Sequence, residues 1–387
     1  MHEQYNTRQL LSLGTVIALT PALRLFPARA AQLAGRAGWL AGLAALPLAL
    51  GWAWAMGRFL EAMQPGEQLP DLLLRLGGKG FGRPAIGVFA VWCLVYAGFV
   101  LRSGADRLVG TIYPGASPLL LSQLMGLVAL MAALSTPRSL VRMGRMLLPL
   151  LLGVLLVLLL SAFLSADADN LLPVGQPDLW PLLKASPIPL DIVSGAGTAL
   201  CMLAGGLKSR SRLFPALALW SAGLCALLSL VSAAVIGVFG DALTAQLARP
   251  FFVLVRTLRF FRTLERVEAL VVMLWIFSDF LITALFLWAG QYSLRLLCGY
   301  RPDTAQHARL DMGEGRFLIW VFGAAAAILS LFLGREPAAL ERWSAAFIPA
   351  GNLCMVFVFL PLLYLAGRQQ GQDSGGAPSA PVSAPRS

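Results

Sequence analysis

The chain has 387 residues, of which 58% are hydrophobic and only 13% are charged. A soluble domain carries about 25% charged residues. The composition therefore excludes a soluble enzyme and a disordered chain, and it predicts a polytopic helical membrane protein. The apolar stretches are continuous and do not alternate with polar residues, which argues against a membrane β-barrel.

The net charge of +11 raises the question of a nucleic-acid partner. The basic residues, however, lie in short loops between apolar runs and not in a block with interleaved aromatic residues. We therefore expect no nucleic acid as a partner. We attribute the positive charge to interaction with the lipid bilayer. Arg and Lys residues in loops set the orientation of a membrane protein and contact anionic headgroups.

A membrane-spanning helix needs roughly 20 apolar residues, and ten stretches qualify. They predict a transmembrane domain over residues 1–368. The remaining residues 369–387, rich in Gly, Ser, Ala and Pro, are predicted to form a disordered cytoplasmic tail. We interpret the first stretch as a retained span, although the Ala28-Arg29-Ala30 after it resembles a signal-peptide cleavage site. The predicted spans are Leu10–Phe26, Trp39–Phe59, Ala85–Leu101, Leu119–Leu134, Leu147–Leu164, Ile188–Leu207, Phe214–Val238, Leu270–Tyr292, Phe317–Leu333 and Ala346–Ala366.

Arg and Lys residues are concentrated in the loops on one side of these spans, which places both termini in the cytoplasm. Arg24 and Arg102 at span ends are expected to extend toward the interface. The long outer loop 239–269 breaks the charge rule, and its Arg spacing predicts an interfacial helix at 249–262. A short cytoplasmic surface helix is predicted at Leu69–Leu76. The basic residues of the short outer loops are Arg29, Arg36, Arg107, Lys184, Arg335 and Arg342.

The ten spans divide into two sets of five, at about 9–164 and about 188–366. Because five is odd, two similar halves must cross the membrane in opposite directions, which is the inverted-repeat plan of many transporters. In that plan the first helix of each half is broken, and the freed backbone groups hold a small polar ligand. The predicted fold class is thus an all-α polytopic membrane protein of about ten transmembrane helices with broken helices 1 and 6.

Small residues occur where this plan needs the breaks. Span 1 contains Gly14-Thr15 and Thr20-Pro21, and span 6 contains Ser194-Gly195-Ala196-Gly197-Thr198. Glycine inside a helix permits other backbone angles, but small residues also allow close helix packing. For Gly14 alone we favour packing, whereas for the run in span 6 we favour a ligand-binding break.

Three further side chains inside or beside the spans are candidates for a ligand site. Asp279, next to Ser278 in span 8, costs at least ~2.5 kcal/mol in a membrane. It is either a proton site or an anchor for a ligand amine, or it is paired with an Arg or hydrogen-bonded to a neighbouring helix. Asp191 opens span 6 and is interpreted as a helix cap. Tyr96 either points its hydroxyl into a central cavity or packs as an aromatic ring with one hydrogen bond.

The sequence contains no Ser/His/Asp set, no carboxylate pair at catalytic spacing and no nucleotide-binding loop. We therefore predict no enzyme activity and no catalytic residues. The chain has two His and five Cys residues, none of them in a C-x-x-C pair. No metal site and no cofactor are expected.

Several short motifs follow one another in order along the chain. Arg8-Gln9-Leu10 precedes Gly14-Thr15, Val100-Leu101-Arg102 closes span 3, and Asn170-Leu171-Leu172-Pro173-Val174 precedes span 6. Their order and spacing resemble the permease-like B subunit of bacterial spore germinant receptors, the endospore germination permease family, from about Thr7 to Leu296 and more loosely to Ala366. The most specific part comprises Arg249-Pro250, Val255-Arg256, Phe261, Leu264-Glu265-Arg266-Val267-Glu268-Ala269-Leu270 and Trp275-Ile276.

The resemblance implies a fold similar to amino acid–polyamine–organocation transporters. It implies a receptor subunit that binds a small germinant, often an amino acid, in the inner membrane of the dormant spore. A larger membrane subunit and a lipoprotein subunit are the implied protein partners. The ligand would lie between spans 1, 3, 6 and 8, and the matching residues Arg102, Arg256, Glu265 and Arg266 would have structural or signalling roles. The alternative function is a proton-coupled amino-acid transporter with Asp279 as the proton carrier.

Overall fold

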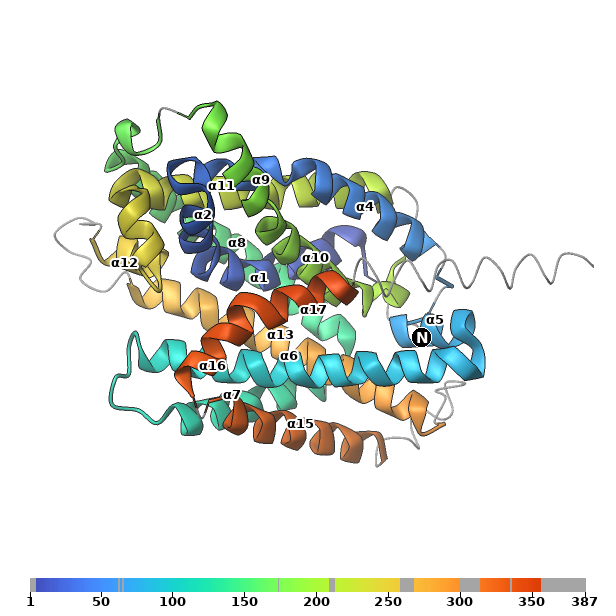
Figure 1. The fold of residues 1–387 in the computed structure, drawn as a ribbon. Helices are drawn as coiled ribbons and strands as arrows, with labels where there is room; N and C mark the ends of the chain where they lie inside the picture. The colour runs from blue at the N-terminus through green and yellow to red at the C-terminus, as the bar shows by residue number, and fades with distance from the viewer. Residues whose placement is uncertain are drawn as a thin grey trace, which may run out of the picture.

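A computed structural model gives the fold, which consists of helices packed around a common apolar core (Figure 1). Its longest helices are α6 (Arg83–Val109), α8 (Pro137–Leu164), α11 (Leu213–Gln246) and α13 (Glu268–Leu297). The structure describes residues 5–61, 63–64, 66–172, 174–208, 213–257, 268–299, 314–334 and 336–355. The predicted tail at 369–387 lies outside these residues.

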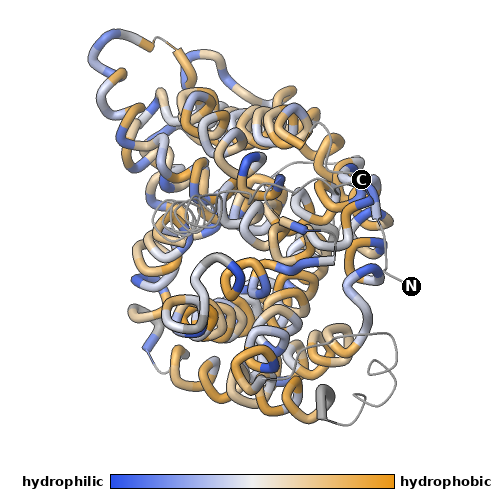
Figure 2. Tube along the Cα trace, turned by 90° about the vertical axis from the view of Figure 1, so that its right-hand side faces the viewer, coloured by the Kyte–Doolittle hydropathy of each residue, from blue (hydrophilic) through white to orange (hydrophobic). Residues whose placement is uncertain are grey.

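Five segments of the described chain are long and apolar enough to cross a membrane, and all five overlap predicted spans. Two further predicted spans correspond to the shorter apolar helices α7 (Pro118–Ala133) and α15 (Glu314–Leu333). The tube in Figure 2 is hydrophobic along most helices. Large apolar side chains of α8, such as Leu156, Val157 and Leu160, are exposed. Only a lipid environment accommodates such a surface, so the chain is an integral membrane protein. The five long segments are Phe26–Glu61, Gly80–Val109, Pro137–Leu164, Leu213–Gln246 and Val272–Leu297.

The first membrane helix is interrupted, but later than the sequence predicted. α1 (Thr7–Arg24) continues through Gly14 and Pro21, and the chain resumes as α2 (Phe26–Ala34) after Leu25. The helix has no break at Gly14-Thr15, in agreement with the packing role favoured for Gly14. A Cβ atom at Gly14 would lie 2.7 Å from Leu200 Cδ1, so this glycine allows close helix packing. The elements that follow are η1 (Gly35–Leu40), α3 (Ala41–Ala44) and α4 (Leu46–Glu61).

The sixth span is also discontinuous, again not at the predicted residues. α10 (Pro187–Cys201) is helical through the run from Ser194 to Thr198, and the regular helix ends only at Cys201. η5 (Ala204–Gly206) follows, and the backbone around Leu207 pairs with Tyr5 ahead of α1. The expectation of a break within Ser194–Thr198 is wrong, because these small side chains pack inside a regular helix. The elements before α10 are η3 (Ala168–Asn170), η4 (Gln176–Asp178) and α9 (Leu179–Ala185).

Corresponding helices of the two predicted halves pack against each other. α1 contacts α10, α4 contacts α11, and α6 contacts α13 along much of their lengths. Figure 1 shows α7 and α15 on the same side of α6, as expected for corresponding fourth helices of the two halves. This order agrees with the expected two-part plan, while the repeat boundaries themselves remain a prediction. The last described elements are α16 (Pro337–Arg342), η6 (Trp343–Phe347) and α17 (Ile348–Cys354).

Several loop predictions need adjustment. The predicted cytoplasmic helix is present as α5 (Leu69–Gly77), followed by η2 (Gly78–Gly82). Leu69, Leu72 and Leu73 are fully buried, so α5 is anchored to the bundle and does not lie free on its surface. The outer loop forms α12 (Pro250–Thr257).

α12 departs from its predicted place at the interface, because Phe251, Phe252 and Val255 are buried in the protein. The predicted helix extended to residue 262, which lies outside the described residues. The long helix α11 turns at Gly240, whose φ of +73° is strained for residues with a side chain. This turn follows the predicted end of span 7 at Val238.

Candidate functional site

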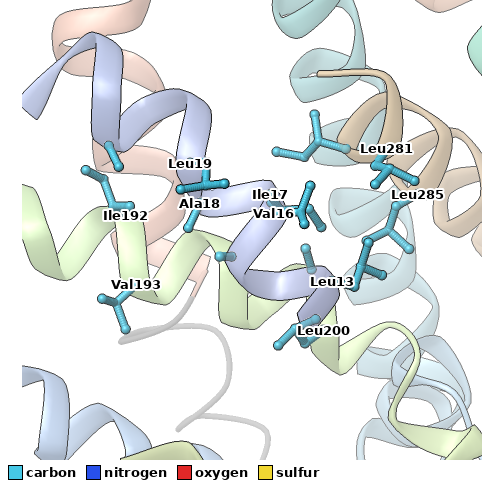
Figure 3. Close-up of a cluster of buried hydrophobic side chains, with 14 of the residues drawn as sticks. Leu13, Val16, Ile17, Ala18, Leu19, Ile192, Val193, Leu200, Leu281 and Leu285 are labelled. Carbon is cyan, nitrogen blue, oxygen red and sulfur yellow. The ribbon is translucent and has the colours of Figure 1, made fainter. Parts of the chain in front are cut away.

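A cavity lies between α1, α6, α10, α13 and the segment η6–α17, so helices of both halves of the chain form its wall. It encloses about 630 Å³ of space not filled by atoms, part of which is open to the outside. Figure 3 shows Ile17, Ala18 and Ile192, which belong to its apolar lining, where α1 and α10 run past α13. The cavity is the candidate ligand site.

One ion pair is buried in the cavity wall. Asp279 Oδ2 of α13 accepts a hydrogen bond from Arg107 Nη2 of α6, and each side chain is only 5% exposed. Of the two interpretations of Asp279, the structure therefore shows the pairing with an arginine. Arg107, predicted in an outer loop, lies on the inner face of α6, because this helix continues eight residues past the predicted span end at Leu101 to Val109.

Arg24 and Asp191 line the same cavity from α1 and α10. Arg24 Nη2 donates to Ser344 Oγ at 2.5 Å, so Arg24 does not extend to the membrane interface as predicted. Asp191 Oδ1 accepts from Asn352 Nδ2 at 2.9 Å. The capping interpretation of Asp191 is wrong, because α10 begins at Pro187 and has no acidic residue in its first turn.

Both interpretations of Tyr96 of α6 hold, because its side chain lines the cavity and also packs as an aromatic ring. Its ring stacks on Phe286 at a centroid distance of 4.4 Å and meets Trp92 edge-on at 5.9 Å. The same side chain lines the cavity, as does Asn352. Tyr96 therefore connects an aromatic cluster to the polar groups of the cavity.

Of the predicted ligand-binding residues, Tyr96, Gly195 and Asp279 line the cavity, whereas Gly14, Thr15, Ser194, Gly197, Thr198 and Ser278 do not. The hydroxyls in this second set are used within the helix bundle. Thr15 Oγ1 accepts from Trp220 Nε1 at 3.0 Å, and Ser278 Oγ donates to Val16 O at 2.7 Å. Ser194 and Thr198 donate to carbonyl groups one turn earlier in α10.

Two of the four residues assigned structural or signalling roles, Arg102 and Arg256, are described by the structure and do not line the cavity. Arg102 is buried within α6, where it is paired with Asp106 at 3.2 Å and donates to Gly334 O at 3.1 Å. It therefore does not extend to the interface. Arg256 lies over the Phe252 ring at 5.6 Å. Glu265 and Arg266 lie outside the described residues, so their roles remain predictions.

Sequence reasoning missed part of the polar lining, namely Ser103, Ser344 and Asn352, and gave Arg24, Arg107 and Asp191 other roles. The sequence did contain a signal for the polar faces of α1 and α6. Thr20 and Arg24 are four residues apart, as are Ser103 and Arg107, and this spacing places polar side chains on one face of a helix. Such a face inside an apolar helix indicates a cavity or a partner.

The lining therefore combines two arginines, two aspartates and neutral polar groups with an apolar wall. This composition is typical of a small-molecule site, where few polar groups fix the orientation of a mostly enclosed ligand. Among the residues that the structure describes, no group of three or more His, Cys, Asp and Glu side chains could hold a metal ion.

Fold and site together define an integral membrane protein with a transporter-like helical fold. Mhp1, a nucleobase-cation-symport-1 family transporter solved in a closed conformation with bromovinylhydantoin bound, is similar with a TM-score of 0.59 and 14% identity, covering 94% of this chain and 79% of that one. MhsT in complex with L-phenylalanine is similar with a TM-score of 0.55 and 13% identity, covering 95% of this chain and 100% of that one. At these identities the likeness concerns the fold alone.

The family model described as "Spore germination protein" matches residues 4–309. The chain therefore belongs to this family of spore germination permeases, as the sequence motifs predicted. No protein with a curated description matches the sequence significantly. The family and the similar structures are permeases and transporters and not enzymes.

Proposed function

We propose that this protein is the membrane subunit of a spore germinant receptor and that it binds a small nutrient, an amino acid, in the central cavity. The observation that carries the proposal is the position of this cavity, which is walled by helices of both halves of the chain. A ligand there contacts α1, α6, α10 and α13 at once. It therefore biases the bundle toward the arrangement that fits it best.

Three further observations support this proposal. The family is one of spore germination proteins, and each of the two similar structures holds a bound small solute. The lining also has both charged and apolar groups, as a nutrient with polar ends requires. In the proposed receptor a larger membrane subunit and a lipoprotein subunit read the helix arrangement, and the receptor resides in the inner membrane of the spore with both termini in the cytoplasm.

The first prediction tests this proposal in spores. Gly195 lines the cavity, and a Cβ atom there would lie 2.9 Å from Asn352 Nδ2. We expect Gly195→Leu to fill the site and raise the nutrient concentration for half-maximal germination by at least ~10-fold, because about 1.4 kcal/mol of lost binding is already tenfold. The measurement is germination against nutrient concentration, with the amount of protein in the inner membrane determined in parallel.

Gly153→Leu is the matched control. Gly153 lies on α8, and a Cβ atom there meets no atom within 4 Å, so this variant should respond like the unchanged protein. A normal response from Gly195→Leu spores that contain the protein in normal amount would contradict the proposal.

A proton-coupled amino-acid transporter is the second candidate, favoured by the acid Asp279 in the cavity wall. A proton carrier there must leave its contact with Arg107 in every cycle. Liposomes that contain the chain alone distinguish the two functions. Net uptake of labelled amino acid that is lost in Asp279→Asn would replace the receptor proposal by the transporter, because a receptor subunit needs its partners to act.

A further inference from the structure

The helix α9, which lies between the two predicted halves of the chain, turns three large apolar side chains away from the protein. Leu179, Trp180 and Leu183 are 58%, 66% and 56% exposed, and we call these three residues the α9 surface. Leu182 and Ala185, on the other side of the helix, pack against the core. Because α9 lies outside every predicted span, the sequence assigns no cover to this surface. Exposed apolar side chains gathered in this way mark a binding surface.

The neighbours of α9 place this surface at the boundary of the membrane. α9 packs against α2 and η1, which join the first predicted span to the second (Figure 1). Trp39, the first residue of the second predicted span, donates through Nε1 to Leu171 O at 3.3 Å, in the loop ahead of α9. Tryptophan is enriched where the membrane meets water, so Trp39 and Trp180 are typical residues of that boundary.

The exposed apolar surface continues from α9 onto a membrane-spanning segment. α9 also contacts α3, and Leu33 of α2 and Leu43 of α3 are both exposed. These two leucines belong to the segment Phe26–Glu61, which is long and apolar enough to cross a membrane. Lipid covers the exposed apolar side chains of such a segment. The continuity of the two surfaces therefore favours lipid, and not a protein, as the occupant of the α9 surface.

Three basic side chains lie on the elements that form this corner of the molecule, and we call them the basic rim. Lys184 of α9 lies over the Trp180 ring at 5.4 Å. Arg29 and Arg36 are four residues before and three residues after Leu33, a spacing that places them on the same side of the helical segment. Within the described part of the chain, none of the three forms an ion pair. The basic rim is therefore suited to anionic groups from outside the protein.

We propose that α9, α2 and η1 together bind an anionic phospholipid at the membrane interface. The α9 surface inserts at the boundary between the headgroups and the acyl chains, and the basic rim contacts the headgroup phosphate. An apolar helix face that carries tryptophan and is flanked by Lys or Arg binds anionic lipid in this manner. This inference goes beyond the proposed function and does not depend on the nutrient.

The proposed lipid site is directly connected to a helix of the cavity. Ser186 is buried and is the only residue between α9 and α10. Its hydroxyl donates to Leu183 O at 2.8 Å, which holds the end of α9 against the start of α10. α10 then carries Asp191 and Gly195 to the cavity. A lipid that favours one position of α9 therefore also biases the helix arrangement around the cavity.

The second prediction locates the α9 surface relative to the lipid. Leu183→Cys is introduced into full-length protein in which the exposed Cys298 and Cys354 are replaced by Ser, and it is labelled with a fluorophore. The protein is studied in lipid nanodiscs, where both faces of the membrane are accessible. We expect lipids brominated on the upper part of the acyl chain to quench the fluorophore, because an interfacial helix buries its apolar face by about 5–10 Å. Iodide in the water should quench it weakly.

Two labelled positions calibrate this measurement. Asp169→Cys in the exposed element η3 should be quenched by iodide and not by brominated lipid. Leu156→Cys on the exposed apolar face of α8 should be quenched by brominated lipid and not by iodide. Quenching at residue 183 that matches Asp169→Cys would overturn the lipid surface. Protection of residue 183 from both quenchers would show that protein covers the α9 surface and would overturn it as well.

A second measurement tests the chemistry of the headgroup. The same fluorophore at residue 183 is quenched by phosphatidylglycerol or by phosphatidylcholine, each carrying a nitroxide at the same acyl position. We expect phosphatidylglycerol to be preferred about fivefold or more, because each nearby Lys or Arg attracts anionic lipid. The triple variant Arg29→Gln/Arg36→Gln/Lys184→Gln should lose this preference and keep the quenching by brominated lipid.

The variant Arg142→Gln/Arg145→Gln is the matched control, because it removes exposed basic residues from the start of α8. It should keep the preference for phosphatidylglycerol. Equal quenching by the two nitroxide lipids would overturn the anionic headgroup, and so would a preference that the triple variant retains. These results are independent of the germination response of Gly195→Leu spores, which tests the proposed function alone.

Discussion

The pair formed by Arg107 and Asp279 shows how a single contact changes the meaning of an intramembrane acid. From the sequence alone, Asp279 is interpreted equally well as a ligand anchor and as an acid paired with an arginine. The contact with Arg107 assigns Asp279 to the wall of the cavity. Among the described residues of the lining, Arg24 and Asp191 are the charged side chains that form no ion pair. Removing one partner of a buried pair leaves the other charge uncompensated.

The third prediction follows from this pair. We expect Asp279→Leu to lower the free energy of unfolding by about 3–5 kcal/mol, because Arg107 then stays buried without its counter-charge. The double variant Arg107→Leu/Asp279→Leu should cost less than Asp279→Leu alone. The measurement is denaturation in detergent followed by circular dichroism.

The exposed pair Arg58–Glu61 provides the control for this comparison. Its atoms are 3.9 Å apart, and its side chains are 63% and 45% exposed. Glu61→Leu should change stability by no more than about 1 kcal/mol. The loss of stability in the double variant is compared with the summed losses of Arg107→Leu and Asp279→Leu. If the two are equal, this pair is not coupled.

At the scale of the helices, the small residues of spans 1 and 6 allow close packing and do not create breaks. Gly197 of α10 faces Trp52 of α4, and a Cβ atom there would lie 2.1 Å from Trp52 Cζ2. Gly14 plays a similar role between α1 and α10. Sequence predicts where small residues gather, but the neighbouring helix decides whether they serve packing or a ligand.

The fourth prediction concerns Gly197→Ala. We expect it to destabilise the protein by about 1–3 kcal/mol through overpacking, because Trp52 is fully buried and its ring has no room to move aside. The readout is the melting temperature without ligand. Gly153→Ala, which meets no neighbour, should not lower it. An unchanged melting temperature combined with lost amino-acid binding would instead place Gly197 in the ligand site.

For the whole molecule, the loop charges predict the side of the membrane on which each end of the bundle lies. Short basic loops stay in the cytoplasm, so we expect the loop that contains Asp169 to be outside and the end of α4 to be inside. The exposed cysteines Cys298 and Cys354 would interfere with a labelling experiment and are replaced by Ser in the protein used for it.

The fifth prediction tests this orientation. We expect a cysteine introduced as Asp169→Cys to react in intact cells with a maleimide that cannot cross membranes. A cysteine introduced as Glu61→Cys should react only after the membrane is permeabilised. Both positions are exposed in the structure, so access to the reagent depends on the membrane alone. The opposite pattern would place the termini outside and overturn the orientation.

The sequence by itself determined the membrane class, the transporter-like helical fold and the family. These follow from local quantities, because each apolar run has its own transfer free energy and each motif its own spacing. Tyr96, Gly195 and Asp279 were also identified as cavity residues from the sequence.

Only the tertiary structure decided which polar side chains meet. Arg24, Asp191 and Asn352 come from three helices far apart in the chain, and their grouping depends on the rotation of each helix about its axis. That rotation is set by close contacts such as those of Gly14 and Gly197 with other helices. The physical reason is that hydropathy is a property of single segments, whereas a binding site is a property of the packing between them.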